Sequence, residues 1–152
     1  EQQWANYRIG EGKGVILWDN LNYAYNQNTM GSTSGSNIGR ADYESHGFAE
    51  RRNKTYGESH DEERLMYRNL TNGATNGVYN VKNLATALER QKAFAAALFT
   101  IPGPKMLWQF GELGFDLSIN RCANGTVNNN CRTDPKPSAF STTLNYYNDP
   151  QR

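Results

Sequence analysis

Short apolar segments alternate with helix-like segments along residues 15–110, and this alternation constrains the fold more than any other feature. Residues 15–18, Val-Ile-Leu-Trp, form a continuous apolar run after Gly14, which predicts a strand buried on both faces. A second apolar strand is predicted over residues 105–110, and a weaker one over residues 55–57. Strands that alternate with helices in this way indicate parallel βαβ units.

Three helices are predicted between or after these strands. The clearest covers residues 84–98, where apolar side chains recur near the helical period of about 3.6 residues and Asn80 or Asn83 serves as the cap. A second helix is predicted over residues 21–30. A third is predicted to begin with the acidic residues 61–63, because carboxylates in a first turn offset the helix dipole.

The remaining segments are rich in Gly, Asn and Ser, so loops are predicted at residues 31–39 and 71–80. From residue 118 to residue 152 the chain is polar and irregular, which predicts a loop-rich tail within one domain of residues 1–152. This length accommodates three βα units but not the roughly 200–250 residues of a complete eight-fold barrel. The predicted fold class is α/β, either a partial TIM-type (β/α) barrel or a small open sheet.

Polar residues follow each predicted strand at Asp19-Asn20, at residues 58–64 and at residues 109–116. Ligands of parallel βα units bind outside the carboxyl ends of the strands. We therefore expect the three groups to converge at one rim. The alternative is that residues after a strand only cap the next helix, and it applies most readily to Asp19-Asn20.

The middle group, residues 58–64, surrounds His60 with four carboxylates and ends in Arg64. Sugar chemistry uses carboxylates because its transition state resembles an oxocarbenium ion. A hard cation is the competing ligand, although the chain has no HExxH motif and no EF-hand spacing. A Ser59-His60-Asp61 nucleophile relay is excluded, because adjacent residues cannot form that hydrogen-bonded chain.

Residues 56–65 read Tyr-Gly-Glu-Ser-His-Asp-Glu-Glu-Arg-Leu, and residues 102–114 read Pro-Gly-Pro, an apolar stretch, then Gly-Glu-Leu-Gly. These segments resemble the seventh- and eighth-strand regions of the α-amylase family of glycoside hydrolases, family 13-like and of bacterial type. Residues 14–31 resemble the family's sixth-strand region. The resemblance implies the C-terminal part of the catalytic (β/α)8 barrel, equivalent to strands six to eight.

The same resemblance implies roles for single residues. Asp61 matches the family's third carboxylate, the catalytic residue that stabilises the transition state and orients sugar hydroxyls. His60 matches the neighbouring histidine that binds the sugar at the cleavage subsite. Arg64, Glu58 and Glu112 match positions expected to support substrate binding.

The family's nucleophilic Asp and acid Glu follow its fourth and fifth strands, and no motif of this chain matches them. The inserted domain that commonly binds calcium also has no counterpart, so no cofactor is expected in this chain, and calcium only in a parent enzyme. The resemblance therefore implies a fragment of an α-glucan-acting hydrolase that is inactive alone. The alternatives are a fragment of an α-1,4-glucan branching or transfer enzyme, and a non-catalytic carbohydrate-binding or self-assembling module.

Cys122 and Cys131 flank a polar loop without any hydrophobic pattern. The pair forms either a disulfide or two free thiols. We favour the disulfide, because the loop offers no core in which a thiol would be buried, and such a bond adds roughly 2–3 kcal/mol. A disulfide indicates an oxidising compartment, so a secreted or periplasmic location is expected.

Composition narrows the choice of partners. The formal charge is +1, with 16 basic and 15 acidic residues, which gives no reason to expect nucleic acid. No apolar run approaches the roughly 18 residues of a membrane span. The expected partners are an α-glucan or maltooligosaccharide and, because a partial barrel leaves open sheet edges, either further copies of the chain or the missing half of the barrel.

Overall fold

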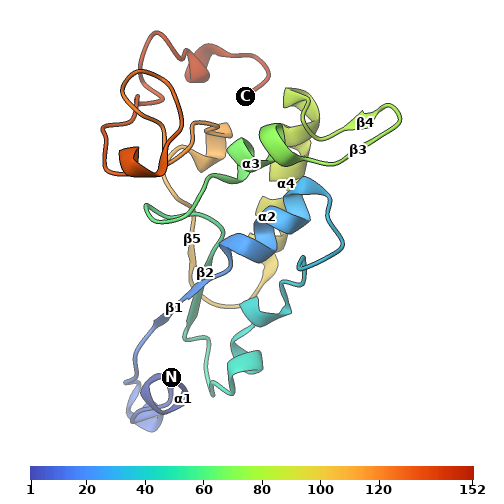
Figure 1. Cartoon of the computed structure of the whole chain (residues 1–152). Helices are drawn as coiled ribbons and strands as arrows, with labels where there is room; N and C mark the ends of the chain where they lie inside the picture. The colour runs from blue at the N-terminus through green and yellow to red at the C-terminus, as the bar shows by residue number, and fades with distance from the viewer.

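The computed structural model describes residues 1–152, and its central element is a small parallel sheet with helices between the strands (Figure 1). No helix is long and apolar enough to cross a membrane. The α-helices are α1 (Gln2–Ala5), α2 (Asn22–Met30), α3 (Leu65–Asn72) and α4 (Leu84–Thr100), and the strands are β1 (Leu17–Asn20), β2 (Asn53–Tyr56), β3 (Thr75–Asn76), β4 (Tyr79–Asn80) and β5 (Lys105–Met106).

The main sheet has the order β1-β2-β5, and both of its pairings are parallel. Leu17 lies opposite Asn53, and Thr55 lies opposite Lys105. Helix α2 connects β1 to β2, while α3 and α4 connect β2 to β5. The predicted α/β class with parallel βα units is therefore confirmed at the level of a three-stranded sheet.

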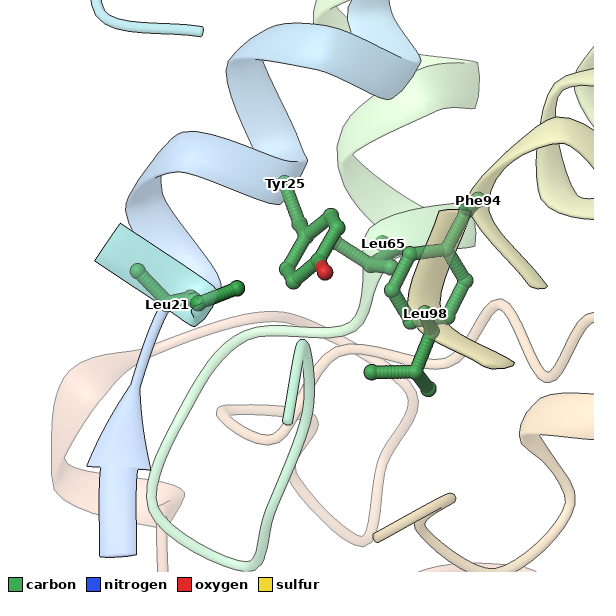
Figure 2. Packing of buried hydrophobic residues seen from close by; sticks show 6 residues of the cluster. Leu21, Tyr25, Leu65, Phe94 and Leu98 are labelled. Atoms are coloured by element: carbon green, nitrogen blue, oxygen red, sulfur yellow. The ribbon is translucent and has the colours of Figure 1, made fainter. Parts of the chain in front are cut away.

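The main core lies among α2, α3 and α4, which contact one another (Figure 2). The rings of Tyr25 and Phe94 meet nearly at right angles with centroids 4.8 Å apart, a favourable edge-to-face geometry. The core cluster consists of Leu21, Tyr25, Ala41, Leu65, Phe94 and Leu98.

The predictions for α2 and α4 are confirmed. Helix α4 begins after Asn83, whose side chain accepts hydrogen bonds from the backbone N–H groups of Ala85 and Thr86. This cap satisfies two of the donors that a helix start leaves unpaired. The helix ends at Thr100, before Pro102, which cannot continue it.

The strand predicted at residues 15–18 begins two residues later and is not buried on both faces. Val15, Ile16 and Trp18 are 41%, 48% and 58% exposed. Side chains of a strand point to the two faces of the sheet, and the apolar clusters of the helices and of the tail do not include these residues. The third strand is also shorter than predicted, because β5 spans only Lys105–Met106.

The prediction that the acidic residues 61–63 form the first turn of a helix is wrong. Helix α3 begins only at Leu65 and has no acidic residue in its first turn. The carboxylate of Glu58 instead accepts a hydrogen bond of 2.6 Å from the Leu65 N–H. An earlier residue thus supplies the negative charge that favours a helix start. The loop predicted at residues 71–80 contains the short antiparallel hairpin β3–β4.

The tail, residues 118–152, contains no α-helix and only short 3-10 turns. It packs on the segment after β5 through a second cluster of Phe115, Ala139 and Tyr146. The predicted disulfide is confirmed, because Cys122 and Cys131 are bonded and no free cysteine exists. The tail lies beyond the carboxyl ends of the parallel strands, where a ligand site of this fold is expected (Figure 1).

Candidate functional site

Members of all three polar groups that follow the strands meet at one rim, although Asp19 and Glu112 lie elsewhere. The Asn20 amide donates a hydrogen bond of 2.5 Å to the carboxylate of Glu62. Arg64 donates to the carbonyl of Gln109 over 2.9 Å. The first group is divided, since Asn20 belongs to the rim while the carboxylate of Asp19 is buried and forms an ion pair with Arg40.

The rim borders a pocket with a volume of about 370 Å³. Three segments line it: the acidic segment (residues 58–64), the stretch after β5, and the tail. The lining combines hydroxyl groups, cations and aromatic rings, and its members include Ser59, His60, Arg64, Trp108, Ser118, Arg132, Lys136 and Ser138. A concave site of this kind, part apolar and part polar, fits a hydroxyl-rich ligand with a flat face.

His60 lies at this pocket with 69% of its side chain exposed. Its ring lies near the indole of Trp108, with centroids 5.8 Å apart. The imidazole Nε2 is 3.4 Å from the Asp61 carboxylate. The predicted ligand-binding histidine is therefore free to reach a ligand, next to an aromatic surface on which a sugar ring can stack.

Asp61 is exposed, and its main partner comes from the tail. The Arg132 guanidinium donates to the Asp61 carboxylate Oδ1 over 2.6 Å and to the Asp61 carbonyl over 2.8 Å. The Asp61 N–H in turn donates to the Ser59 hydroxyl over 3.1 Å. Backbone and side chain of Asp61 are thus both fixed, while the second carboxylate oxygen, Oδ2, faces His60.

Glu58 and Arg64 form a buried ion pair, with N–O distance 3.1 Å and side chains 7% and 6% exposed. Burial raises the pKa of the Glu58 carboxyl, although Arg64 and the Leu65 N–H oppose the shift. Arg64 contacts the Phe115 ring and lines the pocket, whereas Glu58 does not line it. The pair connects the acidic segment to α3 and to the stretch after β5.

Glu112 is not brought together with the other predicted site residues. It is exposed in the turn Gly111–Leu113 and lines a different pocket, of about 250 Å³, together with residues of α4 and the C-terminal Arg152. Trp108, Gln109 and Phe110 still line the rim pocket, and the chain turns away from it only at Gly111–Leu113, which carries Glu112 to the other pocket.

The carboxylates of the acidic segment each bind a different partner, so they do not converge on a common cation. Glu62 accepts from Asn20 and Ser59, and Glu63 accepts from Ser118 and Ile119. The only group of potential metal ligands within 4.8 Å of one another is Cys122, Cys131 and Asp134. Its two sulfur atoms are bonded to each other and are not thiolates, so these residues fit neither a zinc site nor the oxygen cage of calcium.

Sequence reasoning missed the contribution of the tail. Arg132, Lys136 and Ser118 line the pocket, and Arg132 and Ser118 also bind carboxylates of the acidic segment, yet all three lie in a segment without periodicity. The only signal in the sequence was that Arg132 directly follows Cys131, so that a disulfide would fix its backbone.

A scan against protein-family models gives no match to this chain, and a search of curated proteins gives none either.

Proposed function

We propose that this chain is part of an α-glucan-acting glycoside hydrolase of the α-amylase type, in which Asp61 stabilises the transition state. The observation that carries the proposal is the position of Asp61 and His60, beside a pocket at the carboxyl ends of parallel strands, with the Trp108 ring 5.8 Å from the imidazole. The motif resemblance around residues 56–65 and 102–114 supports the same assignment.

The chemistry assigned to the site follows from the groups that line the pocket and from Asp61 beside it. A carboxylate at Asp61 stabilises the positive charge that develops on a sugar ring during cleavage, and His60 hydrogen-bonds a sugar hydroxyl. The indole of Trp108 offers a stacking face. Arg64 acts behind them by holding Glu58 and the Gln109 backbone in place.

A retaining mechanism needs two further carboxyl groups about 5–5.5 Å apart, one on each side of the scissile bond. In this chain Glu58 is buried with Arg64, and Glu62 and Glu63 are bound to other side chains. None of them lines the pocket. We therefore expect sugar binding without hydrolysis by this chain alone.

The fold proposal is that β1, β2 and β5 are three neighbouring strands of a TIM-type barrel. It is supported by their order in the sheet, which follows their order in the chain, and by the open edges of β1 and β5. The chain also exposes 8757 Å², against roughly 7,700 Å² expected for a monomer of 17.1 kDa. The excess, about 1,000 Å², is comparable to one side of a stable interface. A second copy or the remaining barrel would cover it.

A non-catalytic sugar-binding module is the second candidate. The observation that favours it is the lack of any carboxylate among the residues that line the pocket. Under either proposal the disulfide suits an oxidising, extracellular or periplasmic location.

Titration of the chain with maltoheptaose, followed by tryptophan fluorescence, tests sugar binding. Trp108→Phe should abolish the fluorescence change, while Trp18→Phe, which alters an exposed residue outside the pocket, should keep it. Absence of binding contradicts both candidates. Release of reducing sugar by the chain alone contradicts the expected lack of a nucleophile and acid. Self-association is tested by light scattering, and a monomer at all concentrations contradicts it.

A further inference from the structure

The segment of residues 118–132, called the disulfide loop below, is bound at both ends to the acidic segment. At its start, the Ser118 hydroxyl and the Ile119 N–H donate to the Glu63 carboxylate over 2.6 and 3.0 Å. At its end, Arg132 donates to Asp61. The carboxylates that sequence reasoning assigned to chemistry thus also hold one wall of the pocket.

The bond between Cys122 and Cys131 closes this loop. Within it, the Asn128 N–H donates to the Asn120 carbonyl, and the Cys131 N–H donates to the Asn128 carbonyl, each over 2.9 Å. Lys136 then donates to the carbonyls of Cys131 and Asp134 over 2.7 Å. Arg132 therefore leaves a turn whose backbone is fixed on both sides.

The ion pair of Arg132 with Asp61 is too exposed to hold the loop by itself. Its side chains are 44% and 58% exposed, and the attraction of such pairs is largely screened by water and salt. The loop contains no buried apolar side chain between Ser118 and Arg132. The disulfide is therefore the one covalent constraint on this loop, and it fixes the backbone from which Arg132 reaches Asp61.

We propose that Arg132 is a positioning residue for Asp61 and that the Cys122–Cys131 bond is a redox switch for the pocket. A dithiol reductant would open the bond by thiol–disulfide exchange: the reductant loses two electrons and two protons and becomes a disulfide, and the cysteines become two thiols. In the reduced form the backbone between Cys122 and Cys131 is no longer closed into a loop, while Ser118 and Ile119 stay bonded to Glu63. Arg132 then moves away from Asp61, so the pocket loses this part of its wall and Asp61 loses its fixed orientation.

The effect of this wall on ligand binding rests on the proposed sugar-binding function. The positioning of Asp61 by Arg132 does not rest on it, so two separate readouts are used. The first is the carboxyl ¹³C resonance of Asp61, measured by NMR at constant pH in the full chain. The second is the affinity for maltoheptaose. Each is measured for the oxidised chain and in dithiothreitol.

Reduction should shift the Asp61 resonance and weaken maltoheptaose binding on the order of tenfold. Arg132→Gln should produce the same shift and about a threefold loss of affinity, and Arg132→Lys should restore part of both. Arg51→Gln, which removes the same charge from an exposed position outside the pocket, is the matched control and should change neither. Cys122→Ser with Cys131→Ser should reproduce the reduced state without a reductant.

The decisive measurement is reduction of the Arg132→Gln variant. If the disulfide acts on Asp61 through Arg132, reduction should cause no further shift of the Asp61 resonance. The proposal is overturned if the Asp61 resonance stays unchanged both on reduction of the wild-type chain and on the single substitution Arg132→Gln. If the oxidised chain binds no maltoheptaose, the sugar-binding function fails, and the resonance alone decides whether Arg132 positions Asp61.

Discussion

The core among α2, α3 and α4 and the tail at residues 118–152 are both bonded to the acidic segment but are stabilised in different ways. The core buries a contiguous set of apolar side chains, with Leu65 and Leu98 fully inaccessible. The tail has a small apolar cluster near Phe115 and Tyr146, and beyond it one disulfide and hydrogen bonds to carboxylates. The scaffold of the site therefore depends on packing, whereas one wall of its pocket depends on polar and covalent bonds.

The largest effect should come from a cavity in the core. Phe94→Ala removes a ring that is 5% exposed and contacts Tyr25, and should lower the free energy of unfolding by about 3–5 kcal/mol. Phe99→Ala, on the same helix but 57% exposed, should cost less than about 1 kcal/mol. Urea unfolding of both variants checks the difference. Equal losses would show that packing in the core is not what stabilises the scaffold.

The next effect lies at the boundary between the two regions. Arg64→Met leaves the Glu58 carboxylate buried and unpaired, and should lower the free energy of unfolding by about 3 kcal/mol. Adding Glu58→Gln should recover a large part of this loss, because an uncharged amide is less costly to bury. Urea unfolding of the single and double variants tests this, and a double variant that is less stable than Arg64→Met would refute the explanation.

Replacing both cysteines by serine should loosen the tail and leave the core unchanged. Loss of the Cys122–Cys131 bond should reduce local stability by roughly 2–3 kcal/mol. Amide hydrogen exchange should accelerate at Asn128, whose N–H is bonded within the loop, and stay slow at Tyr25, whose N–H is bonded to Leu21. Faster exchange at both residues would show that the two regions unfold together.

The same contrast explains how far the sequence predicted the structure. The helix over 84–98, its cap at Asn80 or Asn83 and the alternation of strands with helices were predictable, because apolar periodicity and capping act over short distances. The convergence of residues 58–64 with residue 20 and residue 109 followed from the geometry of parallel strands. This part of the site is what βα topology dictates.

Other features were beyond sequence reasoning for physical reasons. The exposure of Trp18 depends on which elements pack on the faces of the sheet, which is a tertiary property. Acidic residues at 61–63 look like a helix start, but their carboxylates bind partners outside α3, including Asn20, Arg132 and Ser118. Contacts of Arg132 with Asp61 join residues 71 positions apart through a loop without periodicity. No local pattern encodes such a contact.

The smallest and most discriminating effect concerns two buried tyrosines, one in each region. The Tyr25 hydroxyl lies in the core without a hydrogen-bond partner, whereas the Tyr146 hydroxyl donates to Asp116 in the tail cluster. Tyr25→Phe should therefore raise the free energy of unfolding by about 1 kcal/mol, because it removes an unsatisfied buried polar group. Tyr146→Phe should lower it by a similar amount. Thermal unfolding at neutral pH measures both, and changes of the same sign would contradict the comparison.

The pH dependence of the unfolding free energy at alkaline pH gives a second test of the buried Tyr25 hydroxyl. Burial raises the pKa of Tyr25 to about 12 in the folded chain, against about 10 for an unfolded tyrosine. The unfolded state therefore loses its proton first, so this contribution to stability is complete below pH 10 and disappears as the pH rises toward 12. The pKa of Tyr146 is raised in the same direction, by burial and by Asp116. Between pH 10 and 12 the free energy of unfolding should therefore fall by about 2–3 kcal/mol less in Tyr25→Phe than in the wild type. The decrease that is due to Tyr146 should remain. A variant whose unfolding free energy falls as steeply as that of the wild type over this range would show that Tyr25 ionises as easily in the folded chain as in the unfolded one.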